Sequence, residues 1–566
     1  MMTTQKWKIR KQASDDLEEQ LLSAREIKTD EDKEKFLNPD YERDLHDPFL
    51  ILDMDKAVER ILTAIKNNEK VIVFGDYDAD GVCSSVVFHD FFHKIGFENF
   101  EVYIPDRYKE GYGLNMKCLA DFKKQKVDLI ITVDCGITEY EEIRKANEDG
   151  IDVVVTDHHL QGKKLPFAKA VVDPKREDDN YPYDMLCGAA IAFKVVKALI
   201  EKGVKSGAFN ITKGWSKWLL DVVCIATVAD MVPLTGENRT FAHYGLKVLQ
   251  KTHRPGLLAL YDNLKIKKEN INEDDIGFMI APRINIAGRM EHANISFNLL
   301  TAGNYAEAKW AVERLNQNIK DRRVVVEKIL GEIQSEMKDK KELPEFIYLG
   351  NKNWLPGVLP IVANRLLDAH NRPVFIWGQG DSEFIKGSAR SNGMVNVVDV
   401  MKETDEDFFV DFGGHALAGG FTVAKERASE IEEQLKKAFK KTDKTKIEDV
   451  IWYDKKTALN DIDWKFFEIV DKFSPFGKEN EKPVFMFEDI TVLGIKTFGN
   501  GGPHLQFDFS AKGGKISAIG FFMGDNGDKK LDVENGNKID LLASVEKSMF
   551  KGFKELRLRI VDYRVK

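Results

Sequence analysis

The sequence predicts an α/β protein whose first half carries a parallel sheet and whose last segment forms a small β-barrel. Three observations lead to this prediction. Short runs of β-branched residues alternate with helix-length segments in the first half, which is typical of a parallel sheet covered by helices on both faces. A helical pattern without proline then extends from about residue 304 to residue 340. After about residue 484, strand-like runs follow one another without intervening helices, as in a small barrel.

Length and composition set limits on the class of protein. The chain has 566 residues, which at about 150 residues per domain predicts three to four domains. Apolar residues at 43% and charged residues at 31% are typical of a globular protein. The 84 basic and 93 acidic residues give a net charge of −9, which excludes a protein that coats polyanions through its overall field. A contact with nucleic acid therefore requires a local basic patch.

The cysteines and the hydropathy pattern predict where the protein works. The five cysteines are odd in number and include no Cys-x-x-Cys pair, which predicts reduced thiols rather than disulfides or a zinc site. The first ten residues lack an apolar segment of the kind found in export signals, and no stretch approaches about 18 uninterrupted apolar residues. We therefore expect a cytoplasmic protein without a standard export signal or a membrane span.

The first three segments differ clearly in pattern. Residues 1–45 are polar and heavily charged, so we expect a peripheral N-terminal arm rather than part of a core. Residues 46–303 contain the four runs that predict strands, which are residues 71–74, 129–133, 153–156 and 170–172. Residues 304–342 predict a connecting helix, which at 1.5 Å per residue spans roughly 50 Å. A strut between two domains is the simpler interpretation of this helix, and an arm of a coiled-coil dimer is the alternative.

Two further domains are expected after this helix. Residues 343–445 return to an α/β pattern and include a glycine-dense run at 413–420, which predicts a second, smaller α/β domain. Residues 446–566 begin with a helical segment and then predict strand after strand, separated by Gly, Asn and Pro turns. This pattern is typical of a small barrel, for which the oligonucleotide-binding type is one candidate.

Four segments of the first domain end in side chains that can bind a metal ion. They contain Asp76, Asp78 and Asp80 in the first segment, Asp134 in the second, Asp157, His158 and His159 in the third, and Asp230 in the fourth. The three carboxylates of the first segment alternate, so they share a face and repel one another unless a cation lies among them. Taken singly, this segment is also compatible with a solvated acidic loop, and Asp134 and Asp230 with helix caps. Because ligands collect at the carboxyl edge of a parallel sheet, we interpret the four segments as one site.

The donor set of this site predicts its chemistry. Carboxylates together with imidazole suit a pair of hard to borderline divalent cations, either Mn²⁺ or Mg²⁺. Oxygen ligands alone would favour Mg²⁺, and the histidine favours Mn²⁺. Two such ions about 4 Å apart activate a water molecule and stabilise the attacking and leaving oxygens of a phosphate ester. The sequence therefore predicts hydrolysis of phosphodiester bonds.

At these residues the chain resembles the DHH phosphoesterase superfamily, which is named for the Asp-His-His triplet found here at residues 157–159. The first, second and fourth motifs of that family match residues 76–81, Asp134 and Asp230. Within the family, the order of further segments is most similar to that of bacterial exonucleases that degrade single-stranded DNA from its 5′ end. These segments are residues 47–54, 282–290, 414–415 and 475–483.

The resemblance implies an architecture: a DHH catalytic domain at 46–303, the long helix at 304–342, a DHH-associated substrate-binding domain at 343–445, and an oligonucleotide-binding barrel at 446–566. It also implies two sets of metal ligands that share Asp134, namely Asp78 and Asp134 for the first ion, and Asp80, Asp134, His158 and Asp230 for the second. His159 would face the scissile phosphate as an electrostatic stabiliser or proton donor. Several relatives have a histidine where this chain has Phe74, which cannot bind a metal. We therefore expect the first ion to be held more loosely, with Asp76 or water compensating.

A nuclease that starts at a 5′ end needs cationic side chains for the terminal phosphate, because burying an unpaired dianion is costly. The candidates are Arg107, Arg289, Ser388 and Arg390. The resemblance implies that Arg107, Ser388 and Arg390 contact the 5′ phosphate, and surface salt bridges are the alternative. Backbone N–H groups around Gly414 can approach an anion closely, with His415 as a further ligand for phosphate. A tight turn with close helix packing is the alternative interpretation of this glycine-dense run.

Residues 547–566 carry a net charge of +5, and Phe550, Phe553 and Tyr563 interleave with the basic side chains. This combination is typical of a surface that follows a nucleic-acid backbone and stacks bases. A solvated strand face with core aromatic residues is the alternative interpretation.

We therefore expect a metal-dependent 5′→3′ exonuclease that acts on single-stranded DNA in DNA repair and recombination. The resemblance implies single-strand-binding protein and a helicase as protein partners. One alternative is a phosphodiesterase of the same superfamily acting on nanoRNA or cyclic dinucleotides, although such proteins usually end after the DHH-associated domain. Another is a non-catalytic scaffold that binds single strands, which we would expect to have lost its metal ligands.

Overall fold

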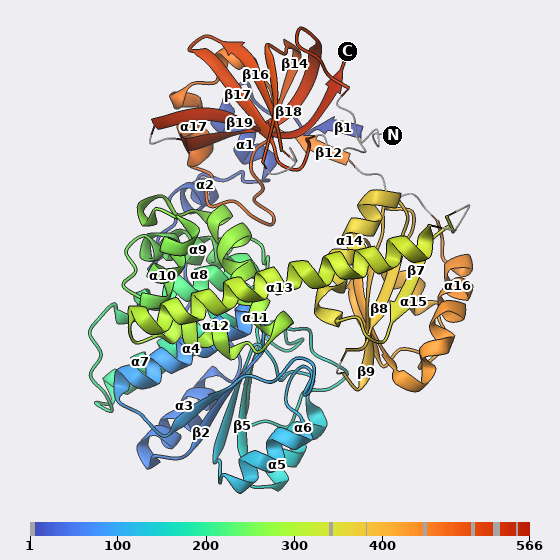
Figure 1. Cartoon of the computed structure of the whole chain (residues 1–566). Coiled ribbons are helices and arrows are strands. Elements are labelled where there is room, and N and C mark those ends of the chain that lie inside the picture. The colour runs from blue at the N-terminus through green and yellow to red at the C-terminus, as the bar shows by residue number, and fades with distance from the viewer. Residues whose placement is uncertain are drawn as a thin grey trace. The chain divides into compact units, whose positions relative to one another are not determined.

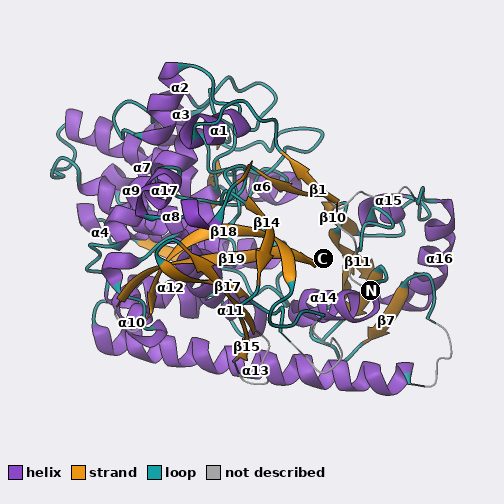
Figure 2. Ribbon diagram, turned by 90° about the horizontal axis from the view of Figure 1, so that it is seen from above, coloured by secondary structure: helices purple, strands orange, loops and turns teal. Residues whose placement is uncertain are grey.

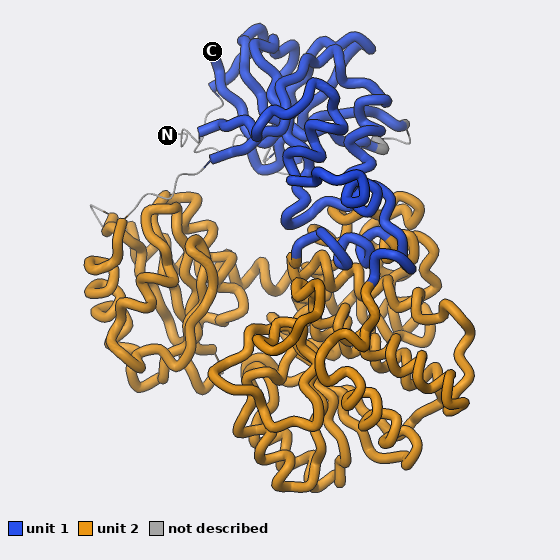
Figure 3. The backbone as a smooth tube through the Cα atoms, turned by 180° about the vertical axis from the view of Figure 1, so that it is seen from behind, with its two compact units in different colours: residues 1–45, 233–243, 448–566 blue, residues 46–232, 244–447 orange. Residues whose placement is uncertain are grey.

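The computed structural model describes residues 6–338, 343–380, 382–444, 450–499, 504–524, 532–550 and 553–566, with the side chains of all of these except residues 549, 550 and 553. The chain divides into two compact units (Figure 3). Unit 1 comprises residues 1–45, 233–243 and 448–566, and unit 2 comprises residues 46–232 and 244–447. Each unit has a hydrophobic core of its own.

The first sheet of unit 2 has five parallel strands in the order β3-β2-β4-β5-β6. Its strands are β2 (Val71–Gly75), β3 (Phe100–Tyr103), β4 (Leu129–Val133), β5 (Asp152–Thr156) and β6 (Ala170–Val172). Every residue of β2 and β4 is buried, as expected for strands covered on both faces. The predicted parallel sheet is therefore confirmed, and the carboxyl ends of β2, β4 and β5 lie side by side.

Helices cover both faces of this sheet (Figure 1). They are α3 (Met54–Asn67), α4 (Ala79–Ile95), α5 (Met116–Lys124), α6 (Tyr140–Glu148) and α7 (Gly188–Lys205). On one face, Phe122 of α5 and Ile143 of α6 share a core with Ile72 of β2. The other three helices lie on the opposite face. Because α4 follows β2 after a short loop, its N-terminus faces the carboxyl edge of the sheet, where ligands bind in such folds.

A helical layer completes the first part of unit 2 and leads into one long helix. Its helices are α8 (Leu220–Ala229), α9 (Gly236–Leu249, which starts in unit 1), α10 (Pro255–Leu264), a π-helix (Asp275–Ile280), α11 (Ala281–Met290), α12 (Asn294–Thr301) and α13 (Tyr305–Met337). Figure 2 shows α13 as one continuous helix, which confirms the predicted strut. Asn304 caps it, since its side chain accepts a hydrogen bond from the N–H of Glu307. None of the helices in the described part of the chain is long and apolar enough to cross a membrane.

The second sheet of unit 2 belongs to the smaller α/β domain and has the order β10-β11-β9-β8-β7. Its elements are β7 (Ile347–Asn351), α14 (Leu359–His370), β8 (Val374–Gly378), β9 (Phe384–Arg390), α15 (Val397–Lys402), β10 (Asp411–His415), β11 (Ala418–Ala424) and α16 (Ile431–Lys441). Only β7 and β8 pair in parallel, and the other pairs are antiparallel. Val326, Ile329 and Ile333 of α13 share a core with β7, β8 and α14, so the long helix is part of this domain as well.

Unit 1 contains a seven-stranded sheet in the order β13-β14-β18-β19-β17-β16-β15. Its strands are β13 (Lys455–Lys456), β14 (Phe485–Thr491), β15 (Gly494–Phe498), β16 (His504–Ala511), β17 (Gly514–Gly520), β18 (Lys538–Phe550) and β19 (Phe553–Val565). The helix α17 (Trp464–Asp471) precedes β14. Phe485, Phe507 and Leu558 lie in the core that these strands enclose. The predicted succession of strands without intervening helices is confirmed.

The N-terminal segment differs from the peripheral arm that its charge predicts. The helix α1 (Leu17–Ala24) buries Leu17, Leu21 and Leu22 in the core of unit 1, and α2 (Asp30–Leu37) follows it. The amide nitrogen of buried Gln20 donates to the carbonyl oxygen of Asp454 at 2.9 Å. The strand β1 (Lys6–Ile9) pairs in parallel with β12 (Val450–Tyr453). The expectation of a peripheral arm was wrong. It rested on the many charged residues of this segment, but the few apolar residues of α1 lie on one face of the helix, and that face packs in the core.

Candidate active site

The loop between β2 and α4 carries the first three carboxylates in a fixed geometry. Asp78 caps α4, since its Oδ1 accepts hydrogen bonds from the N–H groups of Asp80 at 2.8 Å and Gly81 at 3.1 Å. The side-chain oxygen of Asn285 on α11 accepts from the N–H of Ala79 at 2.8 Å. A Cβ atom on Gly81 would lie 2.5 Å from the carbonyl oxygen of Asp76, so only glycine fits this close turn. The loop is therefore held in shape before any ligand binds.

Asp80 and Asp134 are brought together by the N-terminus of α7. The carboxylate of Asp80 accepts hydrogen bonds from the N–H groups of Gly188 at 2.6 Å and Ala189 at 2.7 Å, where the helix dipole also favours negative charge. Asp134 follows β4 in a left-handed conformation with φ of 62°. A Cβ atom on Gly188 would lie 2.7 Å from Cβ of Asp134, so the absent side chain makes room for this carboxylate.

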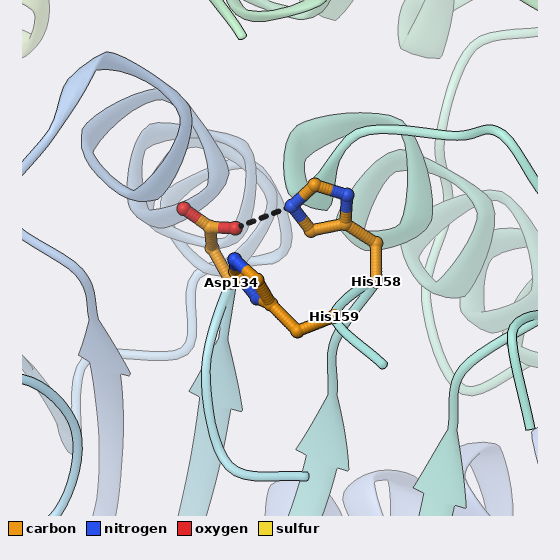
Figure 4. A group of neighbouring side chains, drawn as sticks. All are labelled: Asp134, His158 and His159. Carbon is orange, nitrogen blue, oxygen red and sulfur yellow. Dashed lines mark ion pairs between the residues drawn. The ribbon is translucent and has the colours of Figure 1, made fainter. Parts of the chain in front are cut away.

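Asp157 orients the two histidines that follow it at the end of β5. Its Oδ1 accepts the backbone N–H of His158 at 2.7 Å and lies 2.8 Å from Nδ1 of His159. Its Oδ2 accepts the N–H of Ile137 at 3.0 Å. Figure 4 shows the result, in which the ring of His158 points at the carboxylate of Asp134 and His159 lies beside both.

Six of the predicted residues come together as a metal cluster, by which we mean Asp76, Asp78, Asp80, Asp134, His158 and Asp230. Their ligand atoms form two sets, and the atoms within each set lie within 4.8 Å of one another. One set is Asp76, Asp78 and Asp134, and the other is Asp80, His158 and Asp230. A third such set joins Asp134, His158 and His159. Nε2 of His158 lies 3.1 Å from Oδ1 of Asp134 and 3.6 Å from Oδ2 of Asp80. Two adjacent ligand atoms that each lie about 2.1 Å from the same octahedral ion lie about 3 Å from each other. The distances between these side chains therefore suit ligands that share a cation.

Burial makes the charges of this cluster costly without a cation. It raises the pKa of Asp76 to about 8, with the charge of Asp78 adding to the effect. Burial and the neighbouring carboxylates also hold the pKa values of Asp80 and Asp134 well above their usual range. Within the described part of the chain, Oδ1 of Asp76 is buried and lacks a hydrogen-bond partner. A buried carboxylate oxygen without a donor, in a set of oxygen and imidazole ligands, fits a divalent metal ion.

His159 has a different environment from His158. Burial lowers the pKa of His158 to about 3, and His159 beside it adds to that effect. Burial also lowers the pKa of His159, but its hydrogen bond with Asp157 outweighs this and raises the pKa to about 9. The hydroxyl of Tyr112 donates to the carbonyl oxygen of Asp134 at 3.1 Å and lies 3.3 Å from Nδ1 of His159. His158 is therefore neutral, as a metal ligand would have to be, while His159 keeps a proton at neutral pH.

A second site, the cationic pocket, lies between the smaller α/β domain and residues 107–108 of the first domain. It is a cavity of about 480 Å³ whose lining includes Arg107, Tyr108, Lys386, Ser388, Arg390, Asp411 and the backbone of Gly413, Gly414, Gly419 and Gly420. Four predicted residues, Arg107, Ser388, Arg390 and Gly414, therefore line one cavity. Arg289 lies behind it, since its carbonyl oxygen accepts from the Tyr108 hydroxyl at 2.7 Å. His415 is exposed at the end of β10 and is not part of the lining.

The cationic pocket contains three cationic side chains, Arg107, Lys386 and Arg390, and one carboxylate, Asp411. Nη1 of Arg390 donates to Oγ of Ser388 at 3.0 Å, and Nε donates to Asn364 at 2.8 Å. Nζ of Lys386 lies 3.5 Å from the carbonyl oxygen of Arg107. Among the described residues, no carboxylate lies within ion-pair distance of Arg107, Lys386 or Arg390. Burial lowers the pKa values of Lys386 and Arg390, and the charge of Arg107 lowers that of Lys386 further, while Asp411 offsets part of this effect.

The two sites adjoin each other within unit 2. The guanidinium of Arg107, which lines the cationic pocket, lies 4.7 Å from the ring centre of Tyr77. Tyr77 is the residue between Asp76 and Asp78 of the metal cluster. Tyr77 and Tyr112 also meet edge to face, with 6.5 Å between their ring centres. One aromatic pair therefore links the cationic pocket to His159.

One residue of these sites was not singled out from the sequence, and another was given a different role. Lys386 lines the cationic pocket, and its signal was available, because Lys386, Ser388 and Arg390 alternate along β9 and so share a face. Asp157 was grouped with the ligands, but its hydrogen bonds show a carboxylate that positions His159. The position of a residue at the end of a strand does not by itself distinguish a metal ligand from a residue that orients a ligand.

The predicted DNA-binding tail is only partly described. Lys551 and the side chains of Phe550 and Phe553 lie outside the described residues. Tyr563 is buried, and its ring meets Phe507 edge to face at 5.1 Å. Arg557 pairs with Glu546 at 3.2 Å. For Tyr563 the alternative interpretation, a core aromatic residue, is therefore the correct one.

Three family models match the chain. They are the DHH family N-terminal domain at residues 70–227, the DHHA1 domain at residues 343–444 and the RecJ OB domain at residues 453–562. Together they cover both sheets of unit 2 and the seven-stranded sheet of unit 1. The order of the three domains is the one predicted from the sequence.

Curated relatives and solved structures extend this similarity to the full chain. The single-stranded-DNA-specific exonuclease RecJ of Bacillus subtilis is 33% identical over 554 residues, which cover 96% of this chain and 67% of that protein. The protein of the same name from Haemophilus influenzae is 29% identical, covering 96% and 95%. The crystal structure of RecJ from Thermus thermophilus in complex with Mn²⁺ matches with a TM-score of 0.77 at 25% identity, covering 97% of this chain and 75% of that one.

Proposed function

The chain belongs to the RecJ family of single-stranded-DNA-specific exonucleases, and we propose that it hydrolyses single-stranded DNA from the 5′ end in DNA repair and recombination. The observation that carries this proposal is that a buried metal cluster and a pocket with three cationic side chains adjoin through Arg107 and Tyr77. If the terminal phosphate of a strand binds in the pocket, a phosphodiester bond close to that end would lie at the metal cluster. This arrangement accounts for an enzyme that starts at a phosphorylated end.

We propose two divalent cations, with Mn²⁺ preferred and Mg²⁺ as a substitute. Asp78 and Asp134 would hold the first, with Asp76 beside them, and Asp80, Asp134, His158 and Asp230 would hold the second. Phe74 is buried and stacks on Tyr103 at 5.5 Å, so it belongs to the core and leaves the first ion with fewer ligands. When bound, such ions activate water and neutralise charge on the phosphate oxygens.

The protein's own residues bind and orient the strand around these ions. The guanidinium groups of Arg107 and Arg390 and the Ser388 hydroxyl would hold the 5′ phosphate, with Lys386 as a further cation. Backbone N–H groups near Gly414 would complete the phosphate site, while Arg289 would add positive potential from behind and His415 would approach from the pocket's edge. His159, protonated through Asp157, would donate a hydrogen bond or a proton to the scissile phosphate.

The substrate and the cellular setting complete the proposal. Single-stranded DNA is the proposed substrate because the family name specifies it and because the chain carries a RecJ OB domain. Single-strand-binding protein and a helicase are the proposed partners, and the cytoplasm is the proposed location, on the basis of family membership alone.

A comparison of substrates tests this function. Purified full-length protein would be given 5′-phosphorylated single-stranded DNA, the same strand as duplex, and short RNA, each with Mn²⁺, Mg²⁺ or EDTA. We expect mononucleotides released from the 5′ end of single-stranded DNA with either metal, and no cleavage with EDTA. Preference for short RNA or for a 3′ end would contradict the proposal, and absence of cleavage under all conditions would favour a binding scaffold.

A further inference from the structure

A largely buried arginine joins two helices of unit 2. Nε of Arg254 donates to Oδ2 of Asp221 on α8 at 3.0 Å, and Nη2 donates to Oδ2 of Asp90 on α4 at 2.9 Å. Only 13% of the arginine side chain and 4% of the Asp221 side chain are exposed. We call Arg254, Asp90 and Asp221 the arginine bridge. A guanidinium suits this role because its planar fork can bind two carboxylates at once.

The two joined helices carry metal ligands at their other ends. Asp80 lies in the first turn of α4, about 15 Å along the helix from Asp90. Asp230 directly follows α8, about 14 Å along the chain from Asp221. Asp80 and Asp230 belong to one ligand set with His158. The helices therefore run in opposite directions, with the arginine bridge at one end of the pair and these ligands at the other.

Side chains set the spacing of α4 and α8. A helix satisfies its backbone groups internally, so two packed helices have no ladder of backbone hydrogen bonds between them. The strands that carry Asp134 and His158, in contrast, are held in register by the sheet. Because α4 and α8 pack against each other, a link at one end of the pair also affects their separation at the other end. Asp80 and Asp230 are the ligands that depend on this separation.

The backbone at Arg254 is fixed independently of both helices. Its N–H donates to Oγ1 of Thr252 at 3.1 Å. A Cβ atom on Gly256 would lie 1.8 Å from the carbonyl oxygen of Leu299, so only glycine permits this close packing of α10 on α12. The carbonyl oxygen of Leu300 accepts a hydrogen bond from Nη1 of Arg254 at 2.8 Å. The guanidinium therefore contacts α4 and α8 from a fixed point.

The charges of the arginine bridge stabilise one another. Burial lowers the pKa of Arg254, but the charges of Asp221 and Asp90 outweigh burial and raise this pKa above its usual range. Burial raises the pKa of Asp90, but the charge of Arg254 outweighs it and lowers this pKa below its usual range. Oδ1 of Asp90 lies 3.0 Å from Nδ1 of His89, so both of its oxygens have partners. Loss of the arginine would leave two carboxylates without their cation.

We propose that Arg254 is a positioning residue for the second metal ion, on which it acts through α4 and α8 without touching the ion. By fixing the far ends of these helices, it keeps Asp80 and Asp230 at the spacing that one cation requires. This inference rests on the proposed function, because it takes the set of Asp80, His158 and Asp230 to hold an ion. The first ion takes no ligand from α8 and should not depend on Arg254. An ion pair that only stabilises the fold is the alternative.

Titration of the EDTA-treated, dialysed protein with Mn²⁺, followed by calorimetry, distinguishes these two roles. We expect Arg254→Gln to weaken, by about tenfold or more, the binding event that Asp230→Asn abolishes, as is usual for residues that orient metal ligands. The other binding event should be unchanged. Arg254→Lys keeps the charge but lacks the fork, so it should weaken the same event by a smaller factor, about threefold. Thermal melting in EDTA reports folding, and Arg254→Lys decides the question where Arg254→Gln is unfolded.

Arg60→Gln is the matched control. Arg60 also bridges two carboxylates, Glu69 at 2.6 Å and Asp152 at 2.6 Å. These partners lie just before β2 and at the first residue of β5, where the hydrogen bonds of the sheet already fix the strands. Arg60→Gln should therefore lower Tm in EDTA but leave both Mn²⁺ binding events unchanged.

Three results would overturn the proposal. The first is an unchanged affinity for both ions in Arg254→Gln and Arg254→Lys. The second is an equal loss of affinity for both ions, which would indicate a general loosening of the fold. The third is the same selective loss in Arg60→Gln. Because no DNA is present, a wild type that binds Mn²⁺ as expected but cleaves no single-stranded DNA would contradict the proposed function alone.

Discussion

The metal cluster and the cationic pocket lie in the same unit, but they accumulate charge of opposite sign on sheets of different kinds. The metal cluster crowds buried carboxylates at the ends of parallel strands, and burial raises the pKa of Asp76 to about 8. The cationic pocket presents Lys386 and Arg390 from one antiparallel strand, and burial lowers the pKa values of both. Among the described residues, Arg107, Lys386 and Arg390 form no ion pair with a carboxylate, although Asp411 also lines the pocket. The partners of opposite charge that we propose are metal ions in one site and phosphate in the other.

The two sheets assemble their sites in different ways. In the parallel sheet, the ligands follow the ends of β2, β4 and β5, and Asp230 follows α8, so the metal cluster collects side chains from four separate segments. In the mixed sheet of the smaller domain, alternate residues of β9 share a face, so a single strand supplies Lys386, Ser388 and Arg390. The metal cluster should accordingly be the more sensitive of the two to a single substitution.

Loss of the shared ligand should have the largest effect. Asp134→Asn removes the carboxylate that contributes to two of the ligand sets, and metal ions supply several kcal/mol of transition-state stabilisation. We expect the single-turnover rate on 5′-phosphorylated single-stranded DNA with Mn²⁺ to fall by about a thousandfold or more. Asp121→Asn, at an exposed aspartate of α5 that pairs with Lys124, is the control and should cleave normally. A rate within tenfold of the wild type would show that Asp134 is not a ligand.

Loss of one cation from the pocket should have a smaller and more selective effect. Arg390→Ala removes a charged hydrogen-bond donor, which is worth about 1.5–3 kcal/mol, so kcat/KM for 5′-phosphorylated DNA should fall by about ten- to a hundredfold. DNA with a 5′ hydroxyl should be affected much less. Arg365→Ala, at an exposed arginine of α14 paired with Glu327, serves as the control. Equal losses on both substrates would mean that Arg390 does not bind the terminal phosphate.

Asp157→Asn should change the pH dependence of cleavage. In the wild type, Asp157 raises the pKa of His159 to about 9, so activity that needs the protonated ring should decline as the pH rises through about 9. Without the carboxylate this pKa falls, and the decline should begin at lower pH. We expect a loss of about tenfold at pH 8, a typical effect for a residue that orients a catalytic group. A pH profile parallel to that of the wild type would remove Asp157 from this role.

The smallest effect should be on the stability of the metal-free protein. The pKa of Asp76 is about 8 in the folded chain and about 4 in the unfolded chain, so the folded state binds more protons between these values. The free energy of unfolding should then fall as the pH rises through this window. By calorimetry in EDTA, Tm should be a few degrees lower at pH 8.5 than at pH 6, and Mn²⁺ should abolish the difference. A higher Tm at pH 8.5 in EDTA would contradict this account of the carboxylates.

The sequence was most informative where local pattern and position coincide. Asp76, Asp134 and His158 could be predicted because each follows an apolar run that ends at one edge of a parallel sheet. Residues that act across the fold could not be predicted in this way. Leu21 lies in a charged segment but packs in the core of unit 1, and Tyr77 and Tyr112, from two separate loops, meet edge to face. Such contacts are set by tertiary packing, which leaves no local periodicity to detect.

The most direct test of the central claim is the number of metal ions that the chain binds. Isothermal titration of the EDTA-treated, dialysed protein with Mn²⁺ should give two ions per chain for the wild type, and the ion at Asp78 and Asp134 should bind more weakly than the ion at Asp80, His158 and Asp230. Asp134→Asn should lose both at the same concentrations, because both ions share that carboxylate. Binding of a single ion by the wild type, or of two ions by Asp134→Asn, would contradict the account.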